Sequence, residues 1–197
     1  PRALREPIAA SLIGAELRFV SEELRALFLS AVSSASARAL GAGATVGPAP
    51  ITIPDPLPDP RAELGLEAPY VVFCGRPLPE KRLAAAESIA RRAGATLVCI
   101  GPGPGAAAPG SRATGPLGSA RALGLLRHAA ALLVTSTSEG APTVVREARA
   151  LRVPVVARAS GDLRAWAARD PEILIAESDE AAVALLVTLL RRPLRRP

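Results

Sequence analysis

The feature that most constrains this chain is a regular alternation of short apolar runs and helix-like segments, which starts at Pro69. The apolar runs predict strands at Tyr70–Cys74, Thr96–Ile100, Arg112–Thr114, Ala131–Val134, Pro154–Ala157 and Ile173–Ile175. The segments between them predict helices at about Glu80–Ala93, Gly118–Ala129, Pro142–Leu151, Gly161–Ala168 and Ser178–Arg191. Near-continuous apolar strands that alternate with helices are typical of a parallel sheet covered on both faces. We therefore expect an α/β fold, a Rossmann-like parallel sheet with helices on both faces, which binds ligands at the carboxyl ends of its strands.

The composition fits one sizeable domain with an appendage and argues against nucleic acid as a partner. The chain has 197 residues, of which 49% are hydrophobic and 3% aromatic, so aliphatic side chains must fill the core. Its net charge of +6 suits a polyanionic or phosphorylated partner. The arginines are spread along the chain, however, and few aromatic side chains could stack on bases, so we expect no nucleic-acid binding.

The cysteines and the single histidine form no recognisable metal or disulfide motif. Cys74 and Cys99 stand at the ends of two apolar runs, where reduced core cysteines are expected, and this favours a cytoplasmic setting. His128 follows a predicted helix end and is expected to be a surface residue. We expect neither a metal ion nor another cofactor.

The first part of the chain has a different character. A helix, a short strand at Glu16–Val20 and a second helix with Ser21 as its N-cap are expected there. A proline-rich stretch follows, in which only Ile51–Ile53 could form a short strand. Alternating prolines are typical of an extended linker, so we place a domain boundary there. The apolar stretch near the C-terminus, Ala181–Leu190, is too short to span a bilayer.

The strongest candidate site is the turn that follows the apolar run Ala129–Val134 and opens the helix Pro142–Leu151. A strand, a tight turn and a helix start, in this order, form the place where α/β folds hold phosphate. Pro142 at the first helical position would leave the amides of Thr143 and Val144 free to point at an anion.

Two carboxylates, Glu139 and Glu147, flank this helix start and could accept hydrogen bonds from sugar or ribose hydroxyls. Glu147 lies between two apolar residues of the helix, so it borders the packed face. A carboxylate in that position needs a partner. The partner is either an arginine, Arg146 or Arg152, or the hydroxyl pair of a ligand, and the segment points to a nucleotide-sugar site.

A second set of candidates follows the first strand, in the segment Gly75–Lys81. Gly75 lets the backbone turn, and Arg76 and Lys81 would then lie over the carboxyl end of the strand. Two cations there can neutralise a diphosphate without a metal. The alternative is that both are solvated surface charges.

Two further loops lie on the same rim of the predicted sheet. The loop Gly101–Gly105 lacks the spacing of a dinucleotide fingerprint, and a flexible connection is an equally good interpretation. The turn at Thr114, Gly115 and Leu117 follows the third strand, where backbone groups could hydrogen-bond to the edge of a base.

These segments together resemble the donor-binding, C-terminal half of retaining glycosyltransferases of the GT-B fold, family 4. Gly75–Lys81 resembles the family's G-R-x-x-x-E-K motif, and the run from Leu125 to Ala148 resembles its strand, E-G-x-P turn and E-A helix. Val153–Ala157 resembles the end of its G-V-P-V-V-A strand, with Arg152 where glycine is usual. A further departure is Ser160–Asp162, which stands where the family has two glycines.

The resemblance implies three parts: a remnant of the N-terminal acceptor domain, itself Rossmann-like, at 1–45, a proline-rich linker at 46–68 and a nucleotide-sugar (donor) binding domain at 69–197. Most of the acceptor domain would then be missing from the chain. We therefore expect the chain alone to be inactive and the longer protein to be the transferase.

The resemblance also assigns roles to the candidate residues. Arg76 and Lys81 would bind the donor diphosphate, and with Glu139, which would face the transferred sugar, they form the catalytic set. Glu147 would hold the ribose hydroxyls. The resemblance implies that the transfer needs no metal ion. The whole donor-binding set comprises Gly75, Thr114, Gly115, Leu117, Gly140, Ala141, Pro142, Thr143, Val144 and Glu147.

We accordingly expect a retaining hexosyltransferase that uses a UDP or GDP sugar and an unidentified acceptor, which is a glycan, a lipid or a small molecule. We expect it in the cytoplasm, and the missing domain is the part that would make any peripheral contact with the inner face of the membrane. The alternatives are an isolated nucleotide-sugar binding module without turnover, a nucleotide-sugar epimerase of related fold and a bare structural domain. The spaced glutamates argue against the epimerase.

Overall fold

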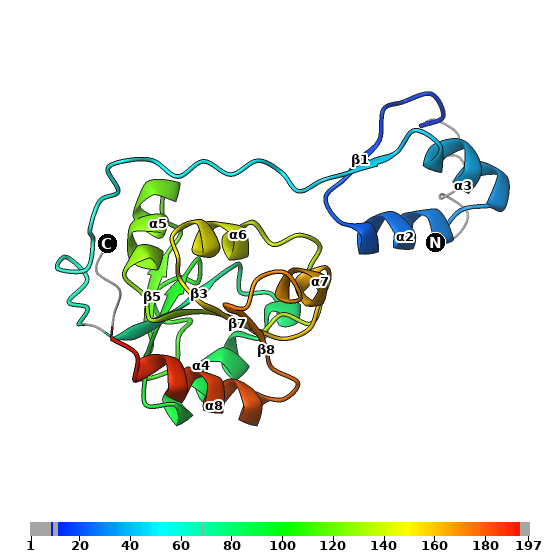
Figure 1. The fold of residues 1–197 in the computed structure, drawn as a ribbon. Coiled ribbons are helices and arrows are strands. Elements are labelled where there is room, and N and C mark those ends of the chain that lie inside the picture. Colours follow the sequence, from blue (N-terminus) through cyan, green and yellow to red (C-terminus); the bar gives the residue numbers. More distant parts are fainter. Residues whose placement is uncertain (1–8, 10–11, 68, 194–197) are drawn as a thin grey trace. The chain divides into compact units, whose positions relative to one another are not determined.

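The computed structural model describes residue 9, residues 12–67 and residues 69–193. The chain forms two compact units, Pro1–Pro50 and Ile51–Pro197 (Figure 1). The predicted division into 1–45, 46–68 and 69–197 stays a prediction, and each unit is described by itself.

The smaller unit contains a short parallel pair of strands, β1 (Arg18–Phe19) and β2 (Thr45–Val46), and the helices α2 (Glu22–Ser30) and α3 (Ser34–Gly41). Ser21 is the N-cap of α2, as predicted, and its hydroxyl accepts a hydrogen bond of 3.1 Å from the amide of Leu24. The first predicted helix lies largely outside the described residues.

The larger unit is built on a parallel sheet of six strands in the order β5-β4-β3-β6-β7-β8. The strands are β3 (Tyr70–Cys74), β4 (Thr96–Ile100), β5 (Arg112–Gly115), β6 (Ala131–Val134), β7 (Val155–Ala157) and β8 (Ile173–Ile175). Each lies within one residue of its predicted position, and β3, β4, β6 and β7 are apolar runs that are largely or fully buried. The predicted fold class is confirmed.

Helices cover both faces of this sheet, and the core is therefore in two layers. They are α4 (Leu83–Arg92), α5 (Ser119–Arg127), α6 (Thr143–Ala150), α7 (Leu163–Ala167) and α8 (Asp179–Leu190). Figure 1 shows α4 and α8 on one face and α5, α6 and α7 on the other. Along β3 the side chains alternate: Tyr70 and Val72 join the layer under α5 and α6, and Val71 and Phe73 join the layer under α4 and α8.

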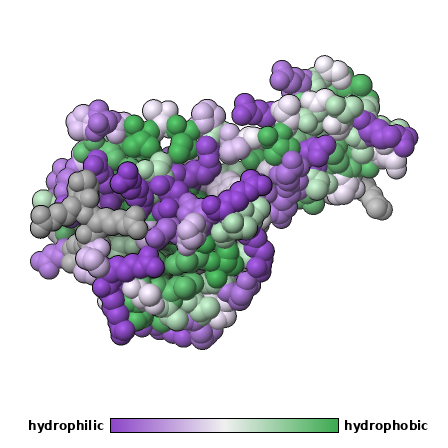
Figure 2. All heavy atoms as spheres, viewed as in Figure 1, coloured by the Kyte–Doolittle hydropathy of each residue, from purple (hydrophilic) through white to green (hydrophobic). Residues whose placement is uncertain are grey.

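The last helix, α8, is apolar over most of its surface, and Ala182, Leu186 and Leu189 are buried against the sheet. In Figure 2, hydrophobic residues gather over the region where Figure 1 draws this helix. Within the described residues, no helix combines the length and the apolar character needed to cross a membrane.

Two local predictions were wrong. The helix predicted from Glu80 begins only at Leu83, because Pro79–Lys81 form a 3-10 turn (η2) and Arg82 takes a left-handed conformation with a φ of 52°. The short strand predicted at Ile51–Ile53 is not formed.

The proline-rich stretch nevertheless packs against the sheet's helical layer. Ile53, Leu57, Leu64 and Leu66 are partly buried against the core cluster that contains Tyr70. The stretch from Ile51 onward therefore belongs physically to the larger unit, although its prolines exclude it from regular structure.

Replacing Gly124 by alanine is expected to destabilise the larger unit. An added Cβ would overlap the carbonyl oxygen of Pro58, because the proline-rich stretch packs directly against α5. Without that contact, alanine would stabilise the helix by up to about 1 kcal/mol, since it is the better helix former. A lower midpoint of thermal unfolding confirms the contact, and a higher one contradicts it. Gly103→Ala is the control, because an added Cβ has open space there.

Candidate functional site

The candidate site lies at the carboxyl ends of β3 and β6, which are neighbours in the sheet. The strand order reverses between them, since β4 and β5 lie on one side and β7 and β8 on the other. The loops after the two strands therefore diverge, and open α/β sheets bind ligands in the crevice formed at such a point. The two loops contain the predicted segments Gly75–Lys81 and Ser138–Pro142.

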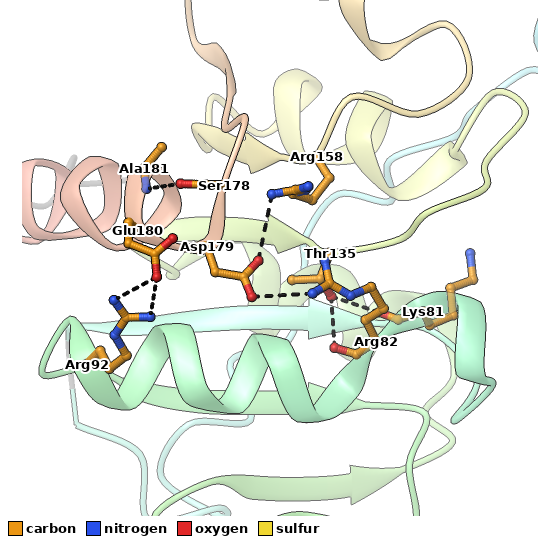
Figure 3. Close-up of polar contacts among 9 residues, drawn as sticks. All are labelled: Lys81, Arg82, Arg92, Thr135, Arg158, Ser178, Asp179, Glu180 and Ala181. Carbon is orange, nitrogen blue, oxygen red and sulfur yellow. Dashed lines mark hydrogen bonds and ion pairs between the residues drawn. The ribbon is translucent and has the colours of Figure 1, made fainter.

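Hydrogen bonds connect the two loops. The buried Thr135, just after β6, donates from its hydroxyl to the carbonyl of Lys81 at 2.7 Å and to that of Arg82 at 3.2 Å (Figure 3). The amide of Thr137 donates to the carbonyl of Glu80 at 2.9 Å. These bonds satisfy the carbonyls of the 3-10 turn and fix the position of Lys81 relative to β6.

A second fixed point lies behind this turn. Figure 3 shows Asp179, at the start of α8, between Arg82 and Arg158. Its carboxylate accepts a hydrogen bond from Arg82 at 3.3 Å and forms an ion pair with Arg158 at 3.8 Å. Arg82, the left-handed residue that follows Lys81, is thus held by Thr135 at its carbonyl and by Asp179 at its side chain.

Lys81 and Glu139 form an ion pair, with 2.6 Å between Nζ and Oε1. The side chains are only 21% and 12% exposed, so the pair is largely removed from water. The Lys81 stem runs past Gly75, where an added Cβ would lie 3.7 Å from Cδ. The structure thus brings together three residues of the predicted set.

Arg76 is placed differently from Lys81. Its side chain is exposed, and its guanidinium makes no hydrogen bond or ion pair with the part of the chain that the structure describes. Arg76 is therefore available to an external anion, whereas Lys81 already has a carboxylate partner.

The predicted helix start lines a small pocket of about 180 Å³. Pro142 was predicted to be the first residue of the helix. It is instead the N-cap of α6, and the helix starts one residue later, at Thr143. Within the described residues, the amides of Thr143 and Val144 donate no hydrogen bond, as expected for the first positions of a helix. The pocket also contains side chains of both loops, and its lining includes Cys74, Lys81, Ser136, Glu139, Pro142, Thr143 and Val144.

Glu147 is half-buried in α6 and, among the described residues, its carboxylate has no hydrogen bond or ion pair. Burial raises the pKa of Glu147, and the charge of Arg146 opposes this shift only in part. Arg146, one of the predicted arginine partners, thus acts on Glu147 through its charge.

The charges of Glu147 and Lys81 both act on the pKa of the Cys74 thiol. The pKa of Cys74 is raised to about 11: burial and the charge of Glu147 raise it, and the charge of Lys81 lowers it. Both charged groups therefore lie near the carboxyl end of β3. The site combines one half-buried carboxylate without a partner, one buried ion pair and a helix N-terminus.

Sequence reasoning missed the contact of the loop after β7 with this site. Gly161 has a φ of 55°, and an added Cβ would overlap the carbonyl oxygens of Glu139 and Gly140. The loop Ser160–Asp162 therefore supports the backbone of the turn Glu139–Ala141. Glycine is needed at 161 both for its conformation and for this close approach.

The other rim loops are closed by internal hydrogen bonds. The amide of Gly115 donates to the carbonyl of Pro102 at 2.8 Å, and its carbonyl accepts from Gly101 at 3.0 Å. The hydroxyl of Thr114 donates to the carbonyls of Cys99 and Gly115 at 3.3 and 2.9 Å. Of the residues predicted to meet a base, this leaves the amide of Leu117 without a partner among the described residues.

The sequence matches a known family over most of the larger unit. The family described as "Glycosyl transferases group 1" matches residues 68–192. No curated protein is similar enough in sequence to add a relative.

Solved glycosyltransferases share the fold at low sequence identity. HepE of Anabaena, solved with UDP and glucose, has a TM-score of 0.74 at 15% identity over 97% of this chain and 58% of its own. AviGT4, from avilamycin A biosynthesis, has a TM-score of 0.57 at 23% identity over 90% of this chain and 55% of its own. The sucrose-phosphate synthase of Thermosynechococcus elongatus has a TM-score of 0.60 at 20% identity over 88% and 51%. The chain thus spans about half the length of these proteins.

Glu147→Gln is expected to raise the thermal stability of the chain at neutral pH. Since burial raises the pKa of Glu147 above its ordinary value of 4.5, the folded state binds this proton more tightly than the unfolded state does. The contribution to stability is therefore full below pH 4.5 and is lost as the pH rises through the folded-state pKa. The neutral amide avoids that loss.

Thermal unfolding of the two proteins at about pH 7 and about pH 4 measures this difference. The midpoint of the variant should be higher at neutral pH, and the two midpoints should converge in acid. Glu67→Gln, at an exposed position, is the control. Equal midpoints at neutral pH would mean that the Glu147 carboxylate has a favourable partner in the folded chain.

Proposed function

We propose that this chain, which belongs to the glycosyl transferases group 1 family, is the donor-binding part of a retaining, family 4 transferase. The transferase would move a hexose from a UDP or GDP sugar to a glycan, a lipid or a small molecule. The observation that carries the proposal is the Lys81–Glu139 pair, which lines the pocket at the start of α6. In the same helix Glu147 is half-buried, with no hydrogen bond or ion pair among the described residues.

The first role that we propose is charge stabilisation on the leaving group. When the bond between the sugar and the diphosphate breaks, negative charge develops on the diphosphate oxygens. Lys81, Thr143 and Val144 line the pocket at this rim and would donate to an anion there, and the exposed Arg76 lies on the same loop as Lys81. The dipole of α6 adds partial positive charge at the same place.

The two glutamates take the hydroxyl groups of the donor. Glu147 is a half-buried acceptor without a bonded partner, and a ribose diol would supply two donors to it. Glu139 would face the transferred sugar while the hydrogen bond from Lys81 orients its carboxylate. Leu117 would offer its amide to the base. The proposal requires no metal.

The comparisons support a nucleotide-sugar donor. HepE, whose fold the chain shares, was solved with UDP and glucose. The second candidate is a module that binds nucleotide sugar without turnover, and the chain's span of about half of its structural neighbours favours that outcome for the chain alone. We expect no sugar transfer by this chain in isolation.

Binding of UDP and of GDP to the chain, measured by titration calorimetry, tests the donor site. Arg76→Ala and Lys81→Ala should each weaken binding tenfold or more, or about 1.4 kcal/mol, because each removes a cation that faces the diphosphate. Arg112→Ala, at an exposed arginine of β5, should leave the affinity unchanged. The absence of heat with both nucleotides at millimolar concentration would overturn the proposal.

A further inference from the structure

A larger pocket lies at the amino ends of the strands, and the donor site lies at their carboxyl ends. Its volume is about 430 Å³, within the range of small-molecule sites. It is bounded by the residues that lead into β6, β7 and β8, namely Ala129–Ala130, Val153–Pro154 and Glu172. Because the strands are parallel, all their amino ends lie at this end of the sheet, and their carboxyl ends lie at the end that carries the donor site.

The lining combines an apolar surface with guanidinium groups. Ile53 and Leu151 supply partly exposed apolar side chains, while Val153 and Leu189, each 3% exposed, lie mainly in the core. Arg127, Arg152 and Arg192 supply cations. Such a lining fits a ligand with an apolar body and a charged head.

The cations outweigh the carboxylates in this pocket. Arg192 is paired with Glu172 at 3.2 Å, so these two charges offset each other. Arg127 and Arg152 have no ion pair within the described part of the chain. The remaining lining carboxylate, Asp55, is exposed.

The histidine of the pocket contributes little charge near neutral pH. His128 is largely buried, and desolvation, together with the charges of Arg61 and Arg127, lowers its pKa, while Asp59 at 3.7 Å opposes the shift. The anion-binding capacity therefore rests on Arg127 and Arg152.

Arg152 has a backbone conformation that an arginine rarely takes. It follows the C-terminal end of α6 with a φ of 62°, in the left-handed region where glycine is favoured. An arginine here is sterically disfavoured relative to glycine, and such strain is found at positions where the side chain has a use. The use on this surface is to place a guanidinium at the pocket.

We propose that this pocket binds a small molecule that joins an apolar body to one oxyanion group, a carboxylate or a phosphate, which the guanidinium groups of Arg127 and Arg152 receive. Arginine suits both head groups, because its planar fork can bond two oxygens at once. The site is independent of the donor site and of the proposed transfer reaction.

Titration calorimetry with octanoate and with octyl phosphate tests the proposal and distinguishes the two head groups. Binding of at least one is expected, and octanol and inorganic phosphate should each bind at least tenfold more weakly, since each offers only half of the chemistry. Saturating UDP should not displace the ligand. No binding of either amphiphile at millimolar concentration, equal binding of octanol, or displacement by UDP would each overturn the proposal.

Arg152→Gly separates a binding role from a structural one. Glycine relieves the left-handed strain, so the unfolding midpoint should be unchanged or higher, while affinity for the better amphiphile should fall tenfold or more. Arg127→Gln should weaken binding as well, and Asp55→Asn should strengthen it by removing a like charge. Arg112→Gln, on β5, is the matched control.

The helix dipole gives the competing explanation of the two arginines. Both lie at helix C-terminal ends, where a cation is favoured without any ligand. In that case Arg152→Gly would leave the affinity for octanoate and octyl phosphate unchanged, and this result would overturn the proposal.

Discussion

The parallel pairing of β3 with β6 is the contact on which the proposed donor site depends. α4, β4, β5 and α5 lie between these strands in the chain, yet the strands are hydrogen-bonded neighbours. Their pairing reverses the strand order, so the loops that follow them leave the sheet in different directions. Lys81 comes from one loop and Glu139 from the other, and the hydroxyl of Thr135 joins the two. Without this pairing the two side chains would have no reason to meet.

The central strands β3, β4, β6 and β7 were predictable from the sequence because each is a local apolar run that the helices on both faces bury. The break at Arg82 was not, since its neighbours have a continuous helical pattern. Its left-handed backbone is stabilised by contacts from distant segments: Thr135 binds its carbonyl and Asp179 binds its side chain. A conformation that depends on such contacts leaves no local trace in the amino-acid pattern, and tertiary structure overrides propensity there.

The candidate residues of the site could likewise be named from the sequence, but their relations could not. The sequence indicated Lys81 and Glu139 as separate ligands of a donor, and the structure shows them as a pair. Gly161 was noted only as a departure from a family pattern, although its lack of a side chain lets it approach Glu139 and Gly140. Whether a position requires glycine depends on the backbone that packs against it, and this is known only from the fold.

The helix α6 relates the two ends of the sheet. It starts at Thr143, which lines the pocket of about 180 Å³ at the carboxyl ends of the strands. Arg152 follows its C-terminal end and lines the pocket of about 430 Å³ at their amino ends. Its dipole favours an anion at the start and a cation at the end, so one helix would stabilise opposite charges at the two proposed sites. Two local destabilisations lie in and after this helix: the half-buried carboxylate of Glu147 in its middle and the left-handed conformation of Arg152 beyond its C-terminal end. A chain selected for stability alone would retain neither, since glutamine and glycine would relieve them.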